Sequence, residues 1–345
     1  MPSQSRGIPD RLRSAPETAS AAGTVGMNSA PFFIVGSGRS GSTLLRMILA
    51  SHSRLAIPPE TWFLQPLVKQ LPIHRPLGSE ELAEAMRVIT SHYCWPDMHM
   101  DVGQFRKAAS ALDRPYLSQV VEVIYRQHMA REGKQRWGDK TPCYIGIIPQ
   151  LARMFPGARF IHLLRDGRDV AKSFQATGWY GAWLHDNTAE WAEALDYEER
   201  WGCSPLAAEM LQVRYEELVK QPEETVRRIC AFLDEAFEPQ MLSWQDNVAR
   251  LVPEREIRFH KKLTRRPNAA DAERWQREMS AREVFVCEAF MGRHLARSGY
   301  GRKFANAAWG PAFALSRWYC RRVLPVVGFP IRVLMCKRNR NIAVS

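Results

Sequence analysis

The first residues that could do chemistry lie in "GSGRSGST", residues 36–43. Gly36, Gly41 and Thr43 have the spacing of the Walker A phosphate loop, G-x-x-x-x-G-K-[ST], but Ser42 stands where that pattern requires lysine. Arg39 supplies the cation instead. Such a loop offers backbone N–H groups and the positive end of a helix dipole to an anion. The predicted contacts to that anion come from Gly38, Arg39, Ser40, Gly41, Ser42 and Thr43.

Further cations follow other apolar runs of the sequence. Lys140 lies in "GDKTP", Arg165 ends the run "RFIHLLR", and Ser173 follows eight residues later. This set could hold more than one phosphate-like group. A nucleotide kinase would also need an acid that holds Mg²⁺, and the candidate after an apolar strand, Asp166, comes directly after Arg165. The kinase is therefore an alternative and not the leading hypothesis.

Two of these motifs together resemble a known family. The loop "GSGRSGSTLLR" is similar to the 5′-phosphosulfate loop of sulfotransferases that use 3′-phosphoadenosine 5′-phosphosulfate (PAPS), and "RFIHLLRDGRDVAKSF" is similar to their 3′-phosphate motif. The resemblance covers about residues 31–300 and implies a P-loop-type three-layer α/β sandwich with a central, mostly parallel sheet flanked by helices. It also implies that Arg165 and Ser173 hold the 3′-phosphate.

The stretch "GRSGSTLLRMILASHSRLAIPPET" resembles the protein-tyrosine sulfotransferases and their bacterial relatives. In that branch a glutamate just before a threonine is the catalytic base, which implies Glu60. The loop arginine and a lysine in a "[N/D]KxP" turn stabilise the transition state, which implies Arg39 and Lys140. In "VRYEELVKQPEETVRRICAFL" the resemblance implies that Tyr215 contacts the nucleotide.

This sequence also departs from the family pattern. Thr177 stands where the family can have arginine one turn after the serine. The late basic loop aligns loosely, so Lys262, Arg265 or Arg266 could bind the nucleotide.

Less specific interpretations of the same residues stay open. Glu60 could be an acid at the start of a helix, and Lys140 could simply pair with Asp139. Arg168 is expected to pair with Asp166 or Asp169 and not with ligand. His162, inside an apolar run, is expected in the core, and Trp179 and Tyr180 could line an acceptor cleft or pack in the core.

The chemistry that these residues suit is sulfuryl transfer without a metal. Arg39, Lys140 and the amides of residues 40–43 would neutralise the leaving phosphate, and Glu60 would take the acceptor proton. The acceptor hydroxyl could belong to a sugar, a lipid-linked glycan or other lipid, or a peptide tyrosine. A non-catalytic nucleotide-binding or membrane-surface protein is the alternative from another class.

Composition points to one large domain with a basic extension. The chain has 345 residues and a formal charge of +12, and after Glu288 it carries eleven Lys and Arg and no acidic residue. We expect a disordered tail over 1–30 without a secretory signal, a catalytic domain over 31–300 and a basic, aromatic-rich extension over 301–345. The extension could lie on a membrane surface or pack on the domain, and no nucleic-acid module is evident.

Seven scattered cysteines lack metal-site spacing and suggest a reducing compartment. No apolar stretch is long enough to span a bilayer, so the expected location is cytoplasmic, peripheral at the membrane if the extension binds it.

The elements that must position these residues alternate along the chain. Apolar runs at 32–35, 55–57, 159–164 and 211–214 predict strands. A helical pattern follows the first run, and another follows the run at 159–164 and extends through Phe174. Further helical patterns occupy much of 61–135 and the segments 181–200 and 222–233. "RWGDKTP" reads as a break after a helical region, and 255–280 as an ordered loop or lid. Alternating strands and helices predict a parallel sheet covered on both faces, with ligand loops at the carboxyl ends of its strands.

Overall fold

The structure is a computed structural model that describes residues 30–177, 184–247 and 269–304. The predicted N-terminal tail and most of the basic extension lie outside these residues. The same holds for Trp179, Tyr180, Lys262, Arg265 and Arg266.

The described residues form a parallel five-stranded sheet with the order β2–β3–β1–β4–β5. In the central strand, Ile34 lies opposite Lys140 on one side and Ile161 on the other. The carboxyl ends of neighbouring strands therefore meet at one edge, as predicted. The strands are β1 (Phe32–Gly36), β2 (Leu55–Ala56), β3 (Arg136–Lys140), β4 (Arg159–Leu164) and β5 (Met210–Arg214).

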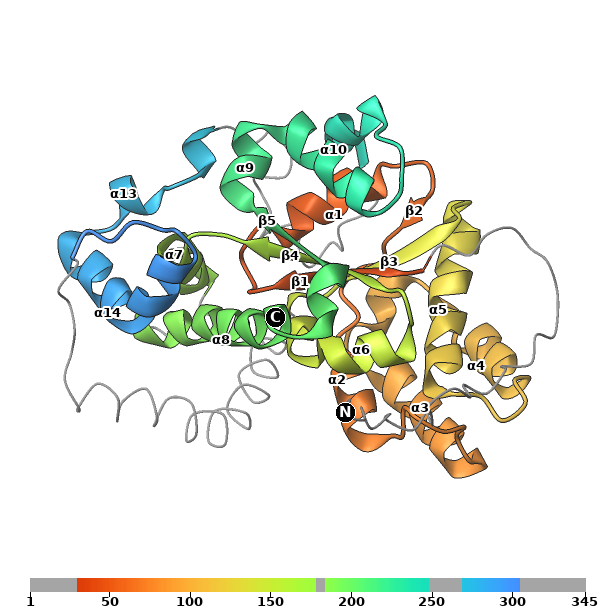
Figure 1. The fold of residues 1–345 in the computed structure, drawn as a ribbon. Coiled ribbons are helices and arrows are strands. Elements are labelled where there is room, and N and C mark those ends of the chain that lie inside the picture. The colour runs from red at the N-terminus through yellow and green to blue at the C-terminus, as the bar shows by residue number, and fades with distance from the viewer. Residues whose placement is uncertain (1–29, 178–183, 248–268, 305–345) are drawn as a thin grey trace, which may run out of the picture.

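Helices cover both faces of the sheet, because the side chains of β1 alternate between two apolar clusters. Phe33 and Val35 pack with α2 to α6, whereas Phe32 and Ile34 pack with α1, α9 and α10. These helices are α1 (Ser42–Ala50), α2 (Leu64–Gln70), α3 (Ser79–Ser91), α4 (Val102–Ser110), α5 (Leu117–Glu132), α6 (Ile148–Met154), α9 (Tyr215–Lys220) and α10 (Pro222–Phe232). Figure 1 shows α1, α9 and α10 on one side of the strands and α2 and α6 on the other.

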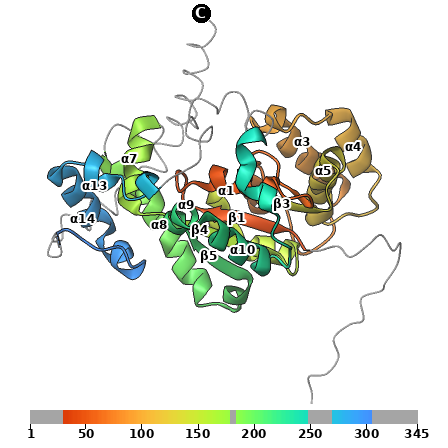
Figure 2. The ribbon, with the colours of Figure 1, turned by 90° about the horizontal axis from the view of Figure 1, so that it is seen from above.

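A third apolar cluster joins α7 (Gly167–Thr177), α8 (Leu184–Gly202) and α14 (Ala281–Arg297). Both views place α7, α14 and the short α13 (Trp275–Glu278) at the end opposite α3, α4 and α5 (Figures 1 and 2). Short 3₁₀ segments complete the described fold: η1 (Trp95–Met98), η2 (Pro142–Ile147), η3 (Pro205–Glu209), η4 (Pro239–Asn247) and η6 (Ala269–Asp271).

One strand was missed by the sequence analysis. Residues 136–140, interpreted as a break, form β3 beside β1. The polar composition of "RWGDK" hides the strand, yet all five residues are buried because their charged side chains find partners. Arg136 donates to the Ala30 carbonyl over 2.8 Å and pairs with Glu235 over 3.3 Å. The sheet therefore has a polar strand next to its centre.

The other expected strands and helices agree with the structure where it describes them, whereas the segment 255–280, expected as an ordered loop or lid, contains η6 and α13 in its described part. Residues 61–135 contain four α-helices, and α5 buries the predicted apolar face of Leu117, Val120, Val121, Ile124 and Tyr125. His162 lies in the core with 1% exposure. None of the helices in the described part combines the length and the apolar composition that a bilayer span requires.

Candidate active site

The predicted anion loop joins β1 to α1 at the carboxyl edge of the sheet. Its backbone enters the left-handed region at Arg39 (φ 62°) and Gly41 (φ 95°). A Cβ atom added to Gly41 would lie 2.4 Å from Cδ2 of Tyr215, because that ring packs against the loop. Position 41 therefore requires glycine for both its φ angle and its space.

The polar side chains of the loop turn inward. Ser40, Ser42 and Thr43 are buried, and the Arg39 Nε donates to the Ser173 Oγ over 3.2 Å. Among the described residues the buried Ser40 Oγ has no hydrogen-bond partner. Arg39 of the first motif and Ser173 of the second thus lie in direct contact, although 134 positions separate them.

Glu190 of α8 also contacts the loop, and the sequence analysis missed it. Its carboxylate accepts the Gly38 N–H over 2.9 Å and the Ser37 hydroxyl over 2.7 Å. No local pattern distinguishes this glutamate from others of α8, because it reaches the loop through the packing of α8 on segments that are distant in the sequence. The loop is therefore flanked by two carboxylates, Glu190 on this side and Glu60 on another.

Glu60 and Lys140 form an ion pair at the loop. The Lys140 ammonium, 1% exposed, donates to the Glu60 Oε1 and lies 3.3 Å from the Thr43 Oγ1. The second oxygen of Glu60 accepts the Trp62 indole N–H over 2.8 Å. Residues from three segments, the β2–α2 loop, β3 and α1, thus meet at one point.

Two alternative interpretations of this pair are wrong. Glu60 is not an acid of a helix first turn, because α2 begins at Leu64 with no acid in that turn. Lys140 does not pair with Asp139, because consecutive residues of a strand point to opposite faces. Asp139 instead points into the core, where it accepts hydrogen bonds from Thr61 and Tyr125.

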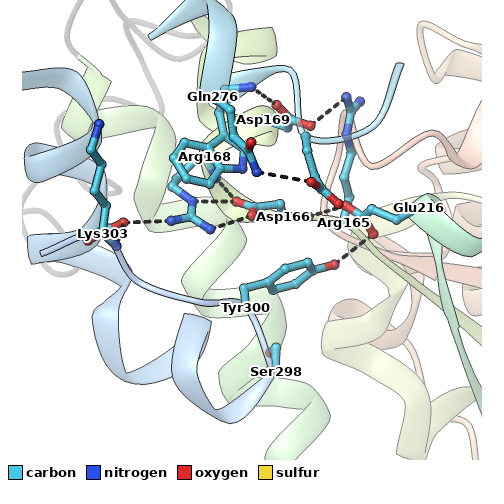
Figure 3. Close-up of polar contacts among 12 residues, drawn as sticks. Arg165, Asp166, Arg168, Asp169, Glu216, Gln276, Ser298, Tyr300 and Lys303 are labelled. Carbon is cyan, nitrogen blue, oxygen red and sulfur yellow. Dashed lines mark hydrogen bonds and ion pairs between the residues drawn. The ribbon is translucent and has the colours of Figure 1, made fainter. Parts of the chain in front are cut away.

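Arg165 directly follows β4, and its side chain contacts the same loop. Its guanidinium stacks 4.3 Å from the centroid of the Tyr215 ring and contacts the Arg39 carbonyl over 3.5 Å. It also pairs with Asp169 over 3.2 Å and donates to the Asp271 carbonyl over 3.1 Å, while its buried Nε has no partner among the described residues. Figure 3 shows Arg165 between Asp169 and Glu216. Burial raises the pKa of the Tyr215 phenol, so the ring that faces the guanidinium is neutral.

Asp169 connects this arginine to the start of α13. Its two oxygens accept the backbone N–H groups of Trp275 over 2.7 Å and Arg274 over 3.3 Å. The segment that follows the undescribed residues 248–268 is therefore fastened to the second motif.

Arg168 faces away from the loop, as predicted. Its guanidinium binds both oxygens of Asp166, over 3.0 and 2.7 Å (Figure 3). It also pairs with Glu288 of α14 over 2.7 Å. Glu288 in turn accepts the backbone N–H groups of Lys303 and Phe304 over 2.8 and 2.7 Å. Burial raises the pKa of Asp166, an effect that the Arg168 contacts oppose. With both oxygens held by Arg168, Asp166 is poorly placed to act as the metal acid of a kinase.

Of the remaining predicted positions, the structure describes Thr177. Thr177 donates to the Phe174 carbonyl over 2.7 Å, a bond within its own helix. Arg265 and Arg266 lie outside the described residues, so their predicted nucleotide contacts stay predictions.

The arrangement suits an anion that carries two charged groups. Arg39, Lys140 and Arg165 gather around a loop of backbone donors, and two buried polar atoms there, the Ser40 Oγ and the Arg165 Nε, lack partners among the described residues. Buried polar groups are normally hydrogen-bonded, so these two atoms fit a ligand that supplies acceptors. A carboxylate, Glu60, stands beside the same loop, where it could take a proton.

Known proteins resemble this chain in sequence and fold. The nodulation protein NoeE of Sinorhizobium fredii is 25% identical over 305 residues, which cover 80% of this chain and 67% of that protein. The protein-tyrosine sulfotransferase of Drosophila melanogaster is 26% identical over 251 residues, which cover 71% of this chain but only 43% of that enzyme. The sulfotransferase domain from the curacin biosynthetic pathway superposes with a TM-score of 0.55 at 21% identity, over 80% of this chain and 99% of the domain. That superposition confirms the predicted P-loop-type α/β fold.

The model of the sulfotransferase family matches residues 31–239, which contain both motifs, Glu60 and Lys140. This match confirms the resemblance drawn from the two motifs, and with it the prediction of a sulfuryl-transferring enzyme. The chain belongs to the sulfotransferase family.

Proposed function

We propose that this site moves the sulfuryl group of PAPS to an acceptor hydroxyl, with Glu60 as the base and with Arg39 and Lys140 as the stabilising cations. The observation that carries the proposal is the position of the Lys140 ammonium between the Glu60 carboxylate and the Thr43 hydroxyl of the anion loop. A base and a leaving-group cation thus stand side by side at an anion site.

The reaction divides between these groups. Glu60 accepts the proton of the acceptor hydroxyl, whose oxygen attacks sulfur while the bond from sulfur to the 5′-phosphate oxygen breaks. The negative charge moves to the phosphate of 3′,5′-adenosine bisphosphate, where Arg39, Lys140 and the amides of residues 40–43 neutralise it. A phosphate at the loop would compete with Glu60 for the Lys140 ammonium, and this competition would leave the carboxylate free to act as a base.

Arg165 and Ser173 would bind the 3′-phosphate. Their contacts with the loop support this role, since Arg165 touches the Arg39 carbonyl and Ser173 accepts from Arg39. Tyr215 would contact the nucleotide from its position against Gly41 and Arg165, and Arg265 or Arg266 would add a further basic contact. A donor with phosphates at both ends could thus bridge the two motifs.

The acceptor is a hydroxyl whose chemical class is a matter for experiment. A tyrosine peptide is the first acceptor to test, because one relative is a protein-tyrosine sulfotransferase. Sugar and lipid hydroxyls are the other two candidates.

Labelled PAPS turnover with a tyrosine peptide, an oligosaccharide and a glycolipid tests the proposal. Glu60→Gln keeps the shape of the side chain and removes its basicity, so turnover should fall about 10²–10⁴-fold while affinity for 3′,5′-adenosine bisphosphate stays nearly unchanged. Glu80→Gln, at an exposed position of α3, is the matched control and should keep full turnover.

Other outcomes identify the alternatives. Full activity of Glu60→Gln would remove Glu60 as the base. Phosphoryl transfer from ATP that requires Mg²⁺ would favour the kinase, whereas tight binding of the bisphosphate with no turnover on any acceptor would favour the non-catalytic protein.

A further inference from the structure

Two neighbouring contacts connect the loop after β2 to the end of β3, and they face opposite sides. On one side Glu60 pairs with Lys140 at the anion loop. On the other side the next residue of the loop, Thr61, donates its hydroxyl to the Oδ2 of Asp139 over 2.8 Å, and its backbone N–H donates to the Thr141 Oγ1 over 3.1 Å. The peptide units between Glu60 and Thr61 and between Asp139 and Lys140 therefore join the ion pair at the site to the hydrogen bond in the core.

Two tyrosines complete the core contact. The Tyr125 hydroxyl of α5 donates to the same Asp139 oxygen over 2.8 Å. The Tyr144 hydroxyl lies 2.7 Å from the Thr61 Oγ1 and accepts the Leu64 N–H over 3.1 Å. Thr61, Asp139 and both tyrosines are fully buried. Asp139, Thr141 and Tyr144 thus converge on Thr61, and Tyr125 supports it through Asp139.

The segment that carries Glu60 is bent in a way that needs such support. Trp62 has φ 55°, a left-handed conformation that is costly for a bulky residue and persists only where its surroundings enforce it. The indole N–H of Trp62 donates to the Glu60 carboxylate, so the bend determines the orientation of that carboxylate. The Thr61 carbonyl accepts the Cys94 Sγ over 2.6 Å, which adds a further restraint immediately before the bend.

The neighbours of the network are closely packed. The Tyr125 ring stacks on Trp137 of β3, with centroids 4.0 Å apart and planes 6° from parallel. A buried polar group is costly to leave without a partner, so the hydrogen bonds of the Thr61 hydroxyl and of the Asp139 Oδ2 resist displacement of the two residues, although the Asp139 Oδ1 has no partner among the described residues. Displacing Thr61 or Asp139 must also displace Glu60 or Lys140.

We propose that Thr61 and Asp139 are positioning residues for sulfuryl transfer, which set the Glu60 carboxylate and the Lys140 ammonium against the anion loop from inside the core. This inference rests on the proposed roles of Glu60 and Lys140. Both positioning residues act from inside the core on the two residues beside them, so their loss should lower the rate of the chemical step far more than it weakens donor binding.

The test compares three threonine variants. Thr61→Val keeps the volume and loses the hydroxyl, and it should lower kcat by up to about 10²-fold, as small misplacements of catalytic groups do. The KM for PAPS and the affinity for 3′,5′-adenosine bisphosphate should change far less than kcat, by no more than about fivefold, a separation that general destabilisation would not produce. Thr61→Ser restores the hydroxyl and should recover most of kcat. Thr225→Val, at a buried position of α10, makes the same change away from the network and should leave kcat unchanged.

A crystal structure of Thr61→Val makes the test independent of turnover. It should show that Glu60 and Lys140 have moved apart or away from Thr43. The inference fails if that variant keeps the wild-type contacts, if its kcat stays within twofold of the wild type, or if Thr61→Ser loses as much kcat as Thr61→Val.

If Thr61→Val does not fold, Tyr144→Phe replaces it, because this change removes one partner of the Thr61 hydroxyl and keeps the ring. It should lower kcat at constant KM, and an unchanged kcat would overturn the inference. Wild-type protein that turns over no acceptor would contradict the proposed function alone, since the crystal structure of Thr61→Val would still decide the positioning role.

Discussion

Replacement of Arg165 by alanine tests donor recognition through the 3′-phosphate. The side chain is 8% exposed, so a bond from its guanidinium to a phosphate would form largely out of water. A hydrogen bond to a charged group contributes about 1.5–3 kcal/mol, and about 1.4 kcal/mol corresponds to a tenfold change in affinity. Arg165→Ala should therefore weaken binding of 3′,5′-adenosine bisphosphate by about 10- to 150-fold.

Arg165 also has structural partners, and the assay must separate the two effects. Its loss removes the ion pair to buried Asp169 and the stacking on Tyr215, which would weaken binding of any nucleotide at the loop. Calorimetry with 5′-AMP, which lacks the 3′-phosphate, measures that common loss. The binding free energy that the variant loses for the bisphosphate, minus the binding free energy that it loses for 5′-AMP, isolates the contact between Arg165 and the 3′-phosphate.

Arg274→Ala is a suitable control, because this arginine of the same region pairs with Glu278 and is 30% exposed. It should affect both nucleotides little. If Arg165→Ala weakens both nucleotides equally, or if the wild type binds 5′-AMP as tightly as the bisphosphate, the assignment of Arg165 to the 3′-phosphate is wrong.

Three further results are expected. Gly41→Ala should lower the free energy of unfolding by about 1–3 kcal/mol and weaken bisphosphate binding, because φ is 95° and the new Cβ would meet Tyr215 at 2.4 Å. Thermal melts and calorimetry measure the two effects, and a variant with wild-type stability and affinity would contradict the described loop. Burial raises the pKa of Asp139 from 3.8 to about 6, so the folded state holds its proton more tightly and the free energy of unfolding should fall by about 2 kcal/mol between pH 4 and pH 6 through this group. Urea titrations should show that Asp139→Asn lacks this component; an identical pH dependence would refute it. Full-length protein should sediment with anionic vesicles at low salt and a chain without residues 309–345 should not, whereas full-length protein left in the supernatant would favour an extension that packs on the domain.

The sequence predicted the anion loop and the second motif because both are local patterns at strand ends. Glycine and hydroxyl residues at fixed spacing follow an apolar run in the first, and an arginine ends one in the second. Parallel strands bring such ends to one edge, which is why Arg39 and Ser173 could be expected near each other before any contact was known.

The features that were missed depend on partners distant in sequence. β3 looks like a break because Arg136, Asp139 and Lys140 are charged, and their burial is favourable only with Glu235, Thr61 and Glu60 in place. Glu190 resembles the other acids of α8. Buried charged residues whose partners lie about 80 to 150 positions away produce no periodic pattern in the sequence. Local sequence patterns therefore cannot reveal these contacts.

The buried Glu288 sets a practical limit on how far this protein can be shortened. A chain that ended at residue 300 would keep the pair with Arg168 but would lose the Lys303 and Phe304 amides that bind the two oxygens of the carboxylate. Each hydrogen bond lost from a buried charged group costs about 1–3 kcal/mol, a sizeable part of the stability of a typical domain. Expression trials that remove the basic extension should therefore retain residues through Phe304, and shorter versions are expected to give poor yields of folded protein.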